Sequence, residues 1–308
     1  MVKRRSIGCV SGGANVMGRR AKSAIIRQLN GMNFDEIEFP YVKKIVGELK
    51  GGVPLLLRDM TFDRPIFRAV IHARKPTLAS FLGHPPKELV TGYQRCNPPG
   101  EPVFYEALDP ATPLFEVNPR PGDRVYRSKW SLEGEVTVFQ TSGWGEVEGE
   151  FPLLGNPGSQ QVMSYIDTVF SAPIPHTFST RHKVTAALVS SLRGRIQNKP
   201  SSRLGVVTYP SVADPDKGVN ISIQPEIVSD QLTLDWVEEL VIEDPKLNPA
   251  PNAEPGKLMV FSSVDFANEF TDGEVLWKNR GKRFPGEETG TVVEYHRQGD
   301  PYAWGPNG

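Results

Sequence analysis

Two stretches near the start of the chain space their apolar residues as one face of a helix does. In Ala21–Asn30 the apolar positions recur every four residues, and Tyr41–Lys50 follows a similar pattern. Gly51 and Gly52 stand where the second helix would end. We therefore expect two short helices that form a small cap, preceded by a loose, Gly- and Arg-rich segment over residues 1–20.

Short apolar runs bounded by Gly, Pro or polar residues predict strands. Arg124–Trp130 and Glu135–Thr141 alternate in polarity on either side of Gly134, so we expect them to pair with each other. The other strand candidates are Pro65–Ala69, Val103–Ala107, Leu204–Tyr209, Val219–Ile223, Lys257–Phe261 and Gly290–His296.

Two further helices are expected in the middle of the chain. One runs from about Pro110 to Val117, with Asp109 as its N-cap and the proline in its first turn. The other is Arg181–Leu192, which Ser179 or Thr180 can cap.

The remaining segments read as connections. Gly194 is expected to end the second helix, Gly143–Ser159 reads as a loop, and Pro245–Gly256 reads as a linker because it holds four prolines and no apolar cluster. The strands outnumber the helices and do not alternate with them, which predicts an α+β fold.

Composition excludes some classes of protein. The chain has 308 residues, 38% of them hydrophobic, and a net charge of -1, which gives no overall basic character for nucleic-acid binding. The charge is uneven, since residues 1–50 hold ten Lys and Arg against four acids, and Glu226–Asp244 holds seven acids and no base. We expect both segments to be solvated surface.

The cysteines and histidines carry no metal or disulfide pattern. Cys9 and Cys96 are the only cysteines, and the five histidines lack metal-ligand spacing, so no metal site is expected. A reducing compartment, and therefore the cytoplasm, fits two cysteines best. The chain has no apolar run long enough for a transmembrane helix, so no membrane association is expected.

Three short motifs carry the candidate chemistry. They read IFRA, QRCNPPGEPVFYEALDPATPLFEV and TYPSVADPDKGVN, in that order along the chain. Taken singly, each polar residue in them has an ordinary structural explanation, and only their joint order favours function. The candidate residues are Arg68 in the first, Arg95, Tyr105 and Glu116 in the second, and Ser211 and Asn220 in the third.

In order and spacing these motifs resemble the RES domain family, which is named for its Arg, Glu and Ser. The resemblance covers roughly residues 65–243, and residues 1–60 and those after the linker lie outside it. Gln94 stands where the family usually has Gly, and Val70 where a second Arg is common. The resemblance implies a fold like that of ADP-ribosyltransferases, with a split, mixed β-sheet surrounded by helices and a central NAD cleft.

The resemblance also implies a division of the chain and a set of roles. Residues 1–60 would be an N-terminal helical extension, 61–244 the NAD-binding catalytic domain, and 245–308 a Pro-rich linker with a C-terminal extension. NAD would be the substrate, cleaved at the nicotinamide–ribose bond, with no metal. The implied catalytic residues are Glu116, Arg95, Tyr105 and Ser211, and the implied NAD-binding residues are Arg68, Arg95, Tyr105, Glu116, Ser211 and Asn220.

The residue types suit that chemistry. Arg binds phosphates through two parallel hydrogen bonds and keeps its charge, which fits Arg68 and Arg95 against the two phosphates of NAD. A carboxylate such as Glu116 stabilises the positive charge that builds on the ribose. Tyr105 offers a flat face for a ring and a hydroxyl for a ribose or phosphate, while Ser211 and Asn220 would hydrogen-bond the ligand or hold its cradle.

Three functions stay open at this stage. The first is an NAD-consuming toxin, either a glycohydrolase or a phosphorylase that uses inorganic phosphate; family members usually have a helix-turn-helix antitoxin of the Xre type as partner. The second is an ADP-ribosyltransferase that modifies a macromolecule. The third is a non-catalytic binding protein, whose contact surfaces would be the first 50 residues and the segment after the linker. An assembly of several copies also stays open.

Overall fold

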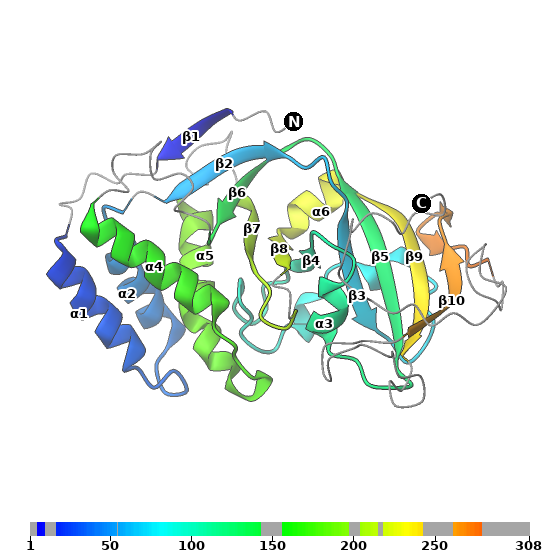
Figure 1. The fold of residues 1–308 in the computed structure, drawn as a ribbon, viewed down its shortest axis with the longest axis horizontal. Helices are drawn as coiled ribbons and strands as arrows, with labels where there is room; N and C mark the ends of the chain where they lie inside the picture. Colours follow the sequence, from blue (N-terminus) through cyan, green and yellow to red (C-terminus); the bar gives the residue numbers. More distant parts are fainter. Residues whose placement is uncertain are drawn as a thin grey trace, which may run out of the picture.

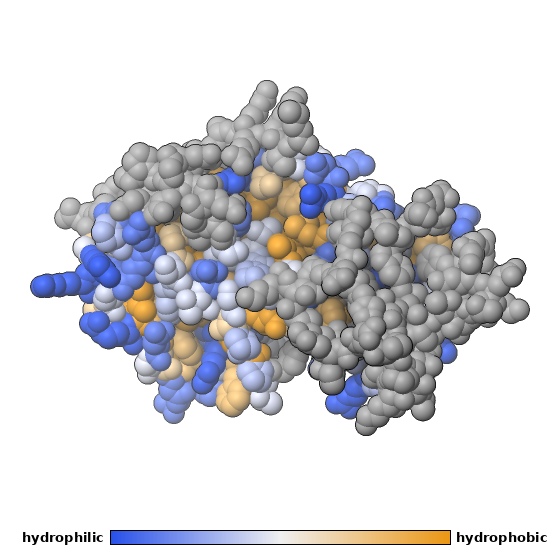
Figure 2. Space-filling model, viewed as in Figure 1, coloured by the Kyte–Doolittle hydropathy of each residue, from blue (hydrophilic) through white to orange (hydrophobic). Residues whose placement is uncertain are grey.

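The chain folds as an α+β protein with a helical layer at one end of a large mixed sheet (Figure 1). The computed structural model describes residues 5–9, 17–53, 55–142, 156–196, 204–214, 218–242 and 261–278. Figure 2 shows hydrophilic residues over much of the outer surface of the helical layer. The α+β class predicted from the sequence is confirmed.

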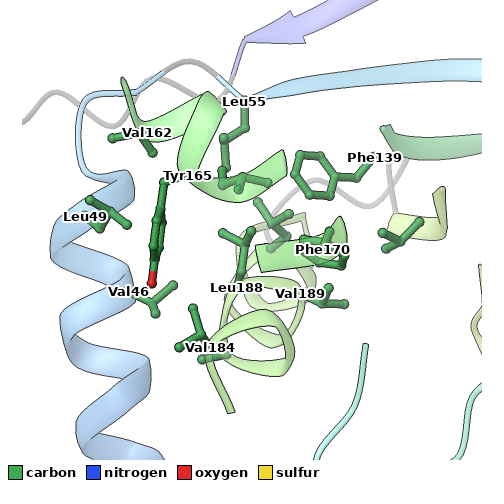
Figure 3. Packing of buried hydrophobic residues seen from close by; sticks show 14 of the residues in the cluster. Val46, Leu49, Leu55, Phe139, Val162, Tyr165, Phe170, Val184, Leu188 and Val189 are labelled. Carbon is green, nitrogen blue, oxygen red and sulfur yellow. The ribbon is translucent and has the colours of Figure 1, made fainter. Parts of the chain in front are cut away.

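Four helices form the helical layer because each buries an apolar stripe against the others. Their common core also receives residues from the neighbouring strands, among them Phe139. Figure 3 shows this core, with Val46, Tyr165 and Leu188 of three different helices converging on one another. The helices are α1 (Arg19–Asn30), α2 (Phe39–Lys50), α4 (Pro157–Ser171) and α5 (Lys183–Ile196).

The two helices predicted near the N-terminus are confirmed as α1 and α2, and Gly51 caps the second. The fully buried Lys22 adds a contact that periodicity does not reveal. Its Nζ donates to the carbonyl oxygens of Leu49 at 2.5 Å and Gly51 at 2.7 Å, so a cation stabilises the C-terminal end of α2. The expectation that residues 1–20 are loose is wrong for residues 5–9 and 19–20, which form β1 and the start of α1.

The main sheet has the strand order β1-β2-β6-β7-β8-β4-β3-β5-β9-β10. Among the described strands, β6 and β7 pair in parallel and every other neighbouring pair is antiparallel. The strands are β1 (Arg5–Cys9), β2 (Leu56–Thr61), β3 (Ile66–Ile71), β4 (Phe104–Ala107), β5 (Arg124–Leu132), β6 (Glu135–Gln140), β7 (Leu204–Pro210), β8 (Val219–Ile223), β9 (Leu232–Ile242) and β10 (Phe261–Ala267).

Short elements complete the fold. A second, two-stranded sheet follows β10. These elements are β11 (Phe270–Thr271), β12 (Glu274–Val275), the helices α3 (Thr112–Val117) and α6 (Pro225–Gln231), and the 3-10 turns η1 (Ala79–Leu82), η2 (Lys87–Leu89) and η5 (His176–His182).

The sheet nearly splits between β3 and β4. These strands share the single pair Phe67–Ala107, whereas β3 pairs with β5 along its whole length. Because β3 diverges, the carbonyl oxygen of Tyr105 accepts a hydrogen bond from Arg68 Nη1 at 2.7 Å. A side chain therefore takes the place of a ladder bond at this point.

Strand alternation gives the sheet around β4 two distinct faces. Ala107, Asn220 and Tyr209 are cross-strand partners and therefore share the face that the helices cover. Phe104 and Ile221 belong to a separate apolar cluster on the opposite face. The position of a residue in β4 or β8 thus decides which face its side chain serves.

The predicted pairing of Arg124–Trp130 with Glu135–Thr141 is wrong. Gly134 does turn the chain, at a φ of +82°, but β5 lies between β3 and β9 while β6 lies between β2 and β7. Most residues of both strands are buried, so each is an interior strand with two other neighbours.

The two helices predicted in the middle of the chain are present as α3 and α5, and each begins two residues later than expected. The helix expected from about Pro110 begins at Thr112 and ends at Val117, as predicted. The Asp109 carboxylate accepts the backbone N–H groups of Ala111 and Thr112, at 3.0 and 2.9 Å. It therefore binds the free N–H groups just before and at the start of α3, as a capping residue does.

The helix expected over Arg181–Leu192 begins at Lys183 and continues past Gly194 to Ile196. Thr180 does not cap it, because its hydroxyl donates to Asp35 Oδ1 at 2.7 Å. The predicted loop Gly143–Ser159 is wrong at its end, where α4 begins at Pro157 after an Asn156 cap. Residues 143–155 lie outside the described residues.

The acidic stretch is not all solvated surface. Glu238 and Glu239 are buried in β9, at 2% exposure each. Glu238 forms an ion pair with Arg127, and Glu239 forms ion pairs with Arg124 and Lys75. The acids are tolerated inside the sheet because basic residues far away in the sequence neutralise them.

Some predictions fall beyond the described part of the chain. They are the linker Pro245–Gly256, the strand Gly290–His296, and the strand Lys257–Phe261 except for its last residue. The division at residues 60 and 61 stays a prediction. In the structure β2 spans that boundary, and α1 and α2 share one core with α4 and α5.

We predict that Glu238→Ala destabilises the protein by about 3–5 kcal/mol, because it leaves the buried Arg127 charge without a counter-ion. Asp235→Ala, in the same strand, is the matched control, since its partner Lys129 is one-third exposed. That change should cost below about 1 kcal/mol. Urea unfolding of both variants measures the difference, and equal losses would contradict a buried pair.

Candidate active site

An exposed carboxylate is held by two buried donors at the C-terminal end of α3. Ser211 Oγ and Asn220 Nδ2 each donate to Glu116 Oε1 at 2.6 Å. Ser211 and Asn220 are 3% and 5% exposed, whereas Glu116 is open to solvent. Three residues predicted from two separate motifs therefore meet at a single oxygen atom.

Local structure fixes each of these side chains. Glu116 lies in the last turn of α3, which ends at Asn118 in the left-handed region with a φ of +45°. Ser211 directly follows β7 and Asn220 lies in β8, and these strands pair antiparallel. The helix end thus lies over the end of a hairpin (Figure 1).

Both donors bind Oε1 of Glu116, so the two oxygens of this carboxylate have different surroundings. Two short hydrogen bonds to the same carboxylate oxygen fix the orientation of the carboxylate. Within the described part of the chain, Oε2 of Glu116 receives no hydrogen bond. The arrangement can therefore present an oriented negative oxygen to a bound molecule.

Tyr209 joins this carboxylate to the predicted Arg95. The Arg95 guanidinium lies 5.6 Å from the centre of the Tyr209 ring. Burial raises the pKa of Tyr209 well above its ordinary value, and the nearby Cys96, Tyr105 and Glu116 raise it further. The sequence analysis missed Tyr209, although it lies in the same motif two residues before Ser211; in the structure it is the cross-strand partner of Asn220.

Arg95 is oriented by the end of α4. Its Nη1 donates to the carbonyl oxygen of Phe170 at 2.6 Å, and its Nη2 donates to that of Ala172 at 3.2 Å. These carbonyls are the negative end of the helix, which suits a cation. Since a guanidinium has five N–H donors, the arrangement leaves some for an anionic ligand.

The Tyr105 hydroxyl is occupied inside the protein. It donates to Asn97 Oδ1 at 2.5 Å and accepts from the Cys96 backbone N–H at 2.9 Å. The contact fixes the loop that carries Arg95. The structure therefore uses the hydroxyl that was predicted to contact a ribose or phosphate, and Asn97, which the site prediction left out, is its partner.

Arg68 does not join the other five residues. It stacks over Phe104, 5.0 Å from the ring centre, on the face of β4 opposite Tyr105. Its guanidinium fills the split between β3 and β4 through the bond to the Tyr105 carbonyl. The sequence could not reveal the position of Arg68. Alternation along a strand shows that neighbouring side chains lie on opposite faces, but it does not show which of the two faces holds the site.

Beside Arg68 lies the buried Glu106. Neither of its carboxylate oxygens has a hydrogen-bond partner among the described residues. Desolvation raises the pKa of Glu106 well above its ordinary value, and the charge of Arg68 opposes this only in part. Burial therefore favours the neutral form of the Glu106 carboxyl, which an apolar strand pattern does not predict.

Two features were sought in the described residues, a membrane-spanning helix and a cluster of metal-ligating side chains. No helix in the described ranges is both long and apolar enough to cross a membrane. Likewise, the described residues contain no group of three or more His, Cys, Asp or Glu side chains arranged to hold a metal ion.

Comparison with solved structures finds similar chains, whereas comparison by sequence finds none. No protein-family model matches the chain, and no curated protein matches it either. A solved structure titled as the M. tuberculosis MbcT–MbcA toxin–antitoxin complex contains a similar chain, at 14% identity and a TM-score of 0.34. The likeness covers 61% of this chain and 88% of that one, and at this TM-score it carries no argument about function.

We predict that Glu106→Gln stabilises the protein at pH 8, because the amide stays neutral in the unfolded state whereas the wild-type carboxyl ionises there. The raised pKa of Glu106 means that its contribution is present at about pH 4 and is lost as the pH rises. The urea midpoints should separate above neutrality and converge toward pH 4. The exposed Glu226→Gln serves as control, and a gap that widens at low pH would contradict the assignment.

We also predict that Cys96 resists alkylation in the folded protein. Burial raises the pKa of its thiol to about 11, so at pH 8 about one thiol in a thousand is ionised. In a Cys9→Ser variant, iodoacetamide should label the protein only after denaturant is added. Rapid labelling of the native protein would show that the loop carrying Arg95 opens readily.

Proposed function

We propose that this chain is an NAD-cleaving enzyme of the RES type that breaks the bond between nicotinamide and ribose. The observation that carries the proposal is the meeting of Glu116, Ser211 and Asn220 at one carboxylate oxygen. The three positions come from two motifs that are about a hundred residues apart in the sequence. An exposed glutamate is normally hydrated by solvent, so two buried donors on one of its oxygens indicate that its orientation matters.

The chemistry of the bond explains the carboxylate. When nicotinamide leaves, positive charge develops on the ribose ring, and a fixed negative oxygen stabilises that charge more than it stabilises the ground state. Glu116 would supply this oxygen and bind the ribose hydroxyls. Ser211 and Asn220 would keep it oriented, so that it does not have to reorganise during the reaction.

The remaining residues would bind and orient the dinucleotide. Arg95, held at the end of α4 and stacked on the Tyr209 ring, would bind a phosphate. Tyr105 and Tyr209 would line the site with their rings. Arg68 lies on the opposite face, so its predicted phosphate contact is not part of this proposal.

The acceptor and the partner extend the proposal. Water would give a glycohydrolase and inorganic phosphate a phosphorylase, and either would deplete NAD and arrest growth of a cell that makes the protein alone. The resemblance to the RES family adds a helix-turn-helix antitoxin of the Xre type as the expected partner.

The test is to incubate the purified protein with NAD, with and without phosphate, and to separate nicotinamide, ADP-ribose and ADP-ribose-1″-phosphate by chromatography. We expect Glu116→Gln to lower the rate on the order of 10³-fold, because the charge is lost while the shape stays. Ser211→Ala and Asn220→Ala should each lower it by roughly 10–100-fold, since each removes one charge-assisted hydrogen bond.

Glu133→Gln, an exposed glutamate in the turn between β5 and β6, is the control and should keep the wild-type rate. The proposal fails if the wild type releases no nicotinamide, or if Glu116→Gln is as active as the wild type. Label from NAD that appears on a protein or nucleic acid would identify a transferase instead.

A further inference from the structure

A buried hydroxyl lies one helical turn before Glu116. Thr112 and Glu116 are four residues apart in α3, so their side chains share one face of the helix. Thr112 is fully buried, and its Oγ1 lies 2.5 Å from Asp109 Oδ2 and 2.6 Å from Asp214 Oδ2. Asp109 belongs to the approach to α3, whereas Asp214 comes from the loop that follows β7.

Asp214 also organises its own loop. Its Oδ2 accepts the Gly218 backbone N–H at 3.2 Å, while its own N–H donates to Ser211 Oγ at 3.0 Å. The Ser211 N–H in turn donates to the Gly218 carbonyl oxygen at 2.7 Å. Because Ser211 Oγ accepts the Asp214 N–H, its own proton is directed to Glu116.

Gly218 shows how closely the loop and the helix approach. A Cβ at this position would overlap Thr112 Oγ1 and would lie 2.7 Å from Asp109 Oδ2. Only glycine allows this distance between the loop backbone and the helix N-terminus. Asn220, the second donor to Glu116, follows two residues later, so its place depends on the same approach.

We propose that Asp214, bound to Thr112, is a positioning residue that fixes the loop against α3 so that Ser211 and Asn220 both meet Glu116. The bond between them is buried, with Asp214 at 4% exposure, and it spans 102 residues of sequence. Two contacts on one helix face, at Thr112 and at Glu116, define the register of the loop. The catalytic consequence rests on the proposed function, whereas the geometric one does not.

The test compares Thr112→Val, which keeps the shape but loses the hydroxyl, with Thr112→Ser, which keeps the hydroxyl, and with Asp214→Asn. We expect Thr112→Val and Asp214→Asn to lower kcat for NAD cleavage by roughly 10–100-fold, with KM changed less than about threefold, because orientation is lost and not binding. Thr112→Ser should recover most of the rate.

The matched control is Thr137→Val, since Thr137 is buried and donates to Asp59 Oδ1 at 2.6 Å between β2 and β6. It loses the same kind of bond away from the site and should keep the wild-type kcat. An effect of Thr137→Val as large as that of Thr112→Val would overturn the proposal, because general destabilisation would then explain both.

A second readout separates this proposal from the proposed function. Hydrogen exchange of the Asn220 side-chain amide, followed by NMR in labelled protein, reports its bond to Glu116 without any substrate. We expect protection in the wild type, in Thr112→Ser and in Thr137→Val, and at least about tenfold faster exchange in Thr112→Val. Unchanged exchange in Thr112→Val overturns the positioning role even if NAD is cleaved, and faster exchange supports it even if NAD is not.

Discussion

The bond from two buried donors to one exposed carboxylate is the contact on which the candidate site depends. Glu116 would be an ordinary surface residue without Ser211 and Asn220, and these two would be buried polar groups without an acceptor. Each side needs the other, so the end of α3 and the β7–β8 hairpin must hold a single register. The close approach at Gly218 and the contact of Thr112 with Asp214 help to fix this register.

The sheet then decides what can reach that carboxylate. Its near-split between β3 and β4 places Arg68 and the buried Glu106 on one face, and Arg95, Tyr105 and Tyr209 on the other with Glu116. The helical layer supplies the carbonyls that orient Arg95. The two charged groups on this face are thus oriented by different parts of the chain: Arg95 by the end of α4, and Glu116 by Ser211 and Asn220.

Much of the fold, and part of the site, could be predicted from the sequence. Periodicity found α1, α2, β3, β4, β7 and β8, because each buries a regular apolar pattern. It could not find the neighbours of β5 and β6, since interior strands do not encode their partners locally, nor the buried state of Glu238 and Glu239, which depends on distant cations. The order of the motifs identified Glu116, Ser211 and Asn220 as candidates. That Arg68 lies on the opposite face of the sheet could be seen only in the structure.

The most direct test of the account is a crystal structure of the Glu116→Gln variant with NAD bound. The account predicts that the nicotinamide ribose lies within hydrogen-bond distance of residue 116, that a phosphate contacts Arg95, and that the ring of Tyr209 or Tyr105 borders the ligand. Density for NAD on the opposite face of β4, beside Arg68 and away from Glu116, would contradict it.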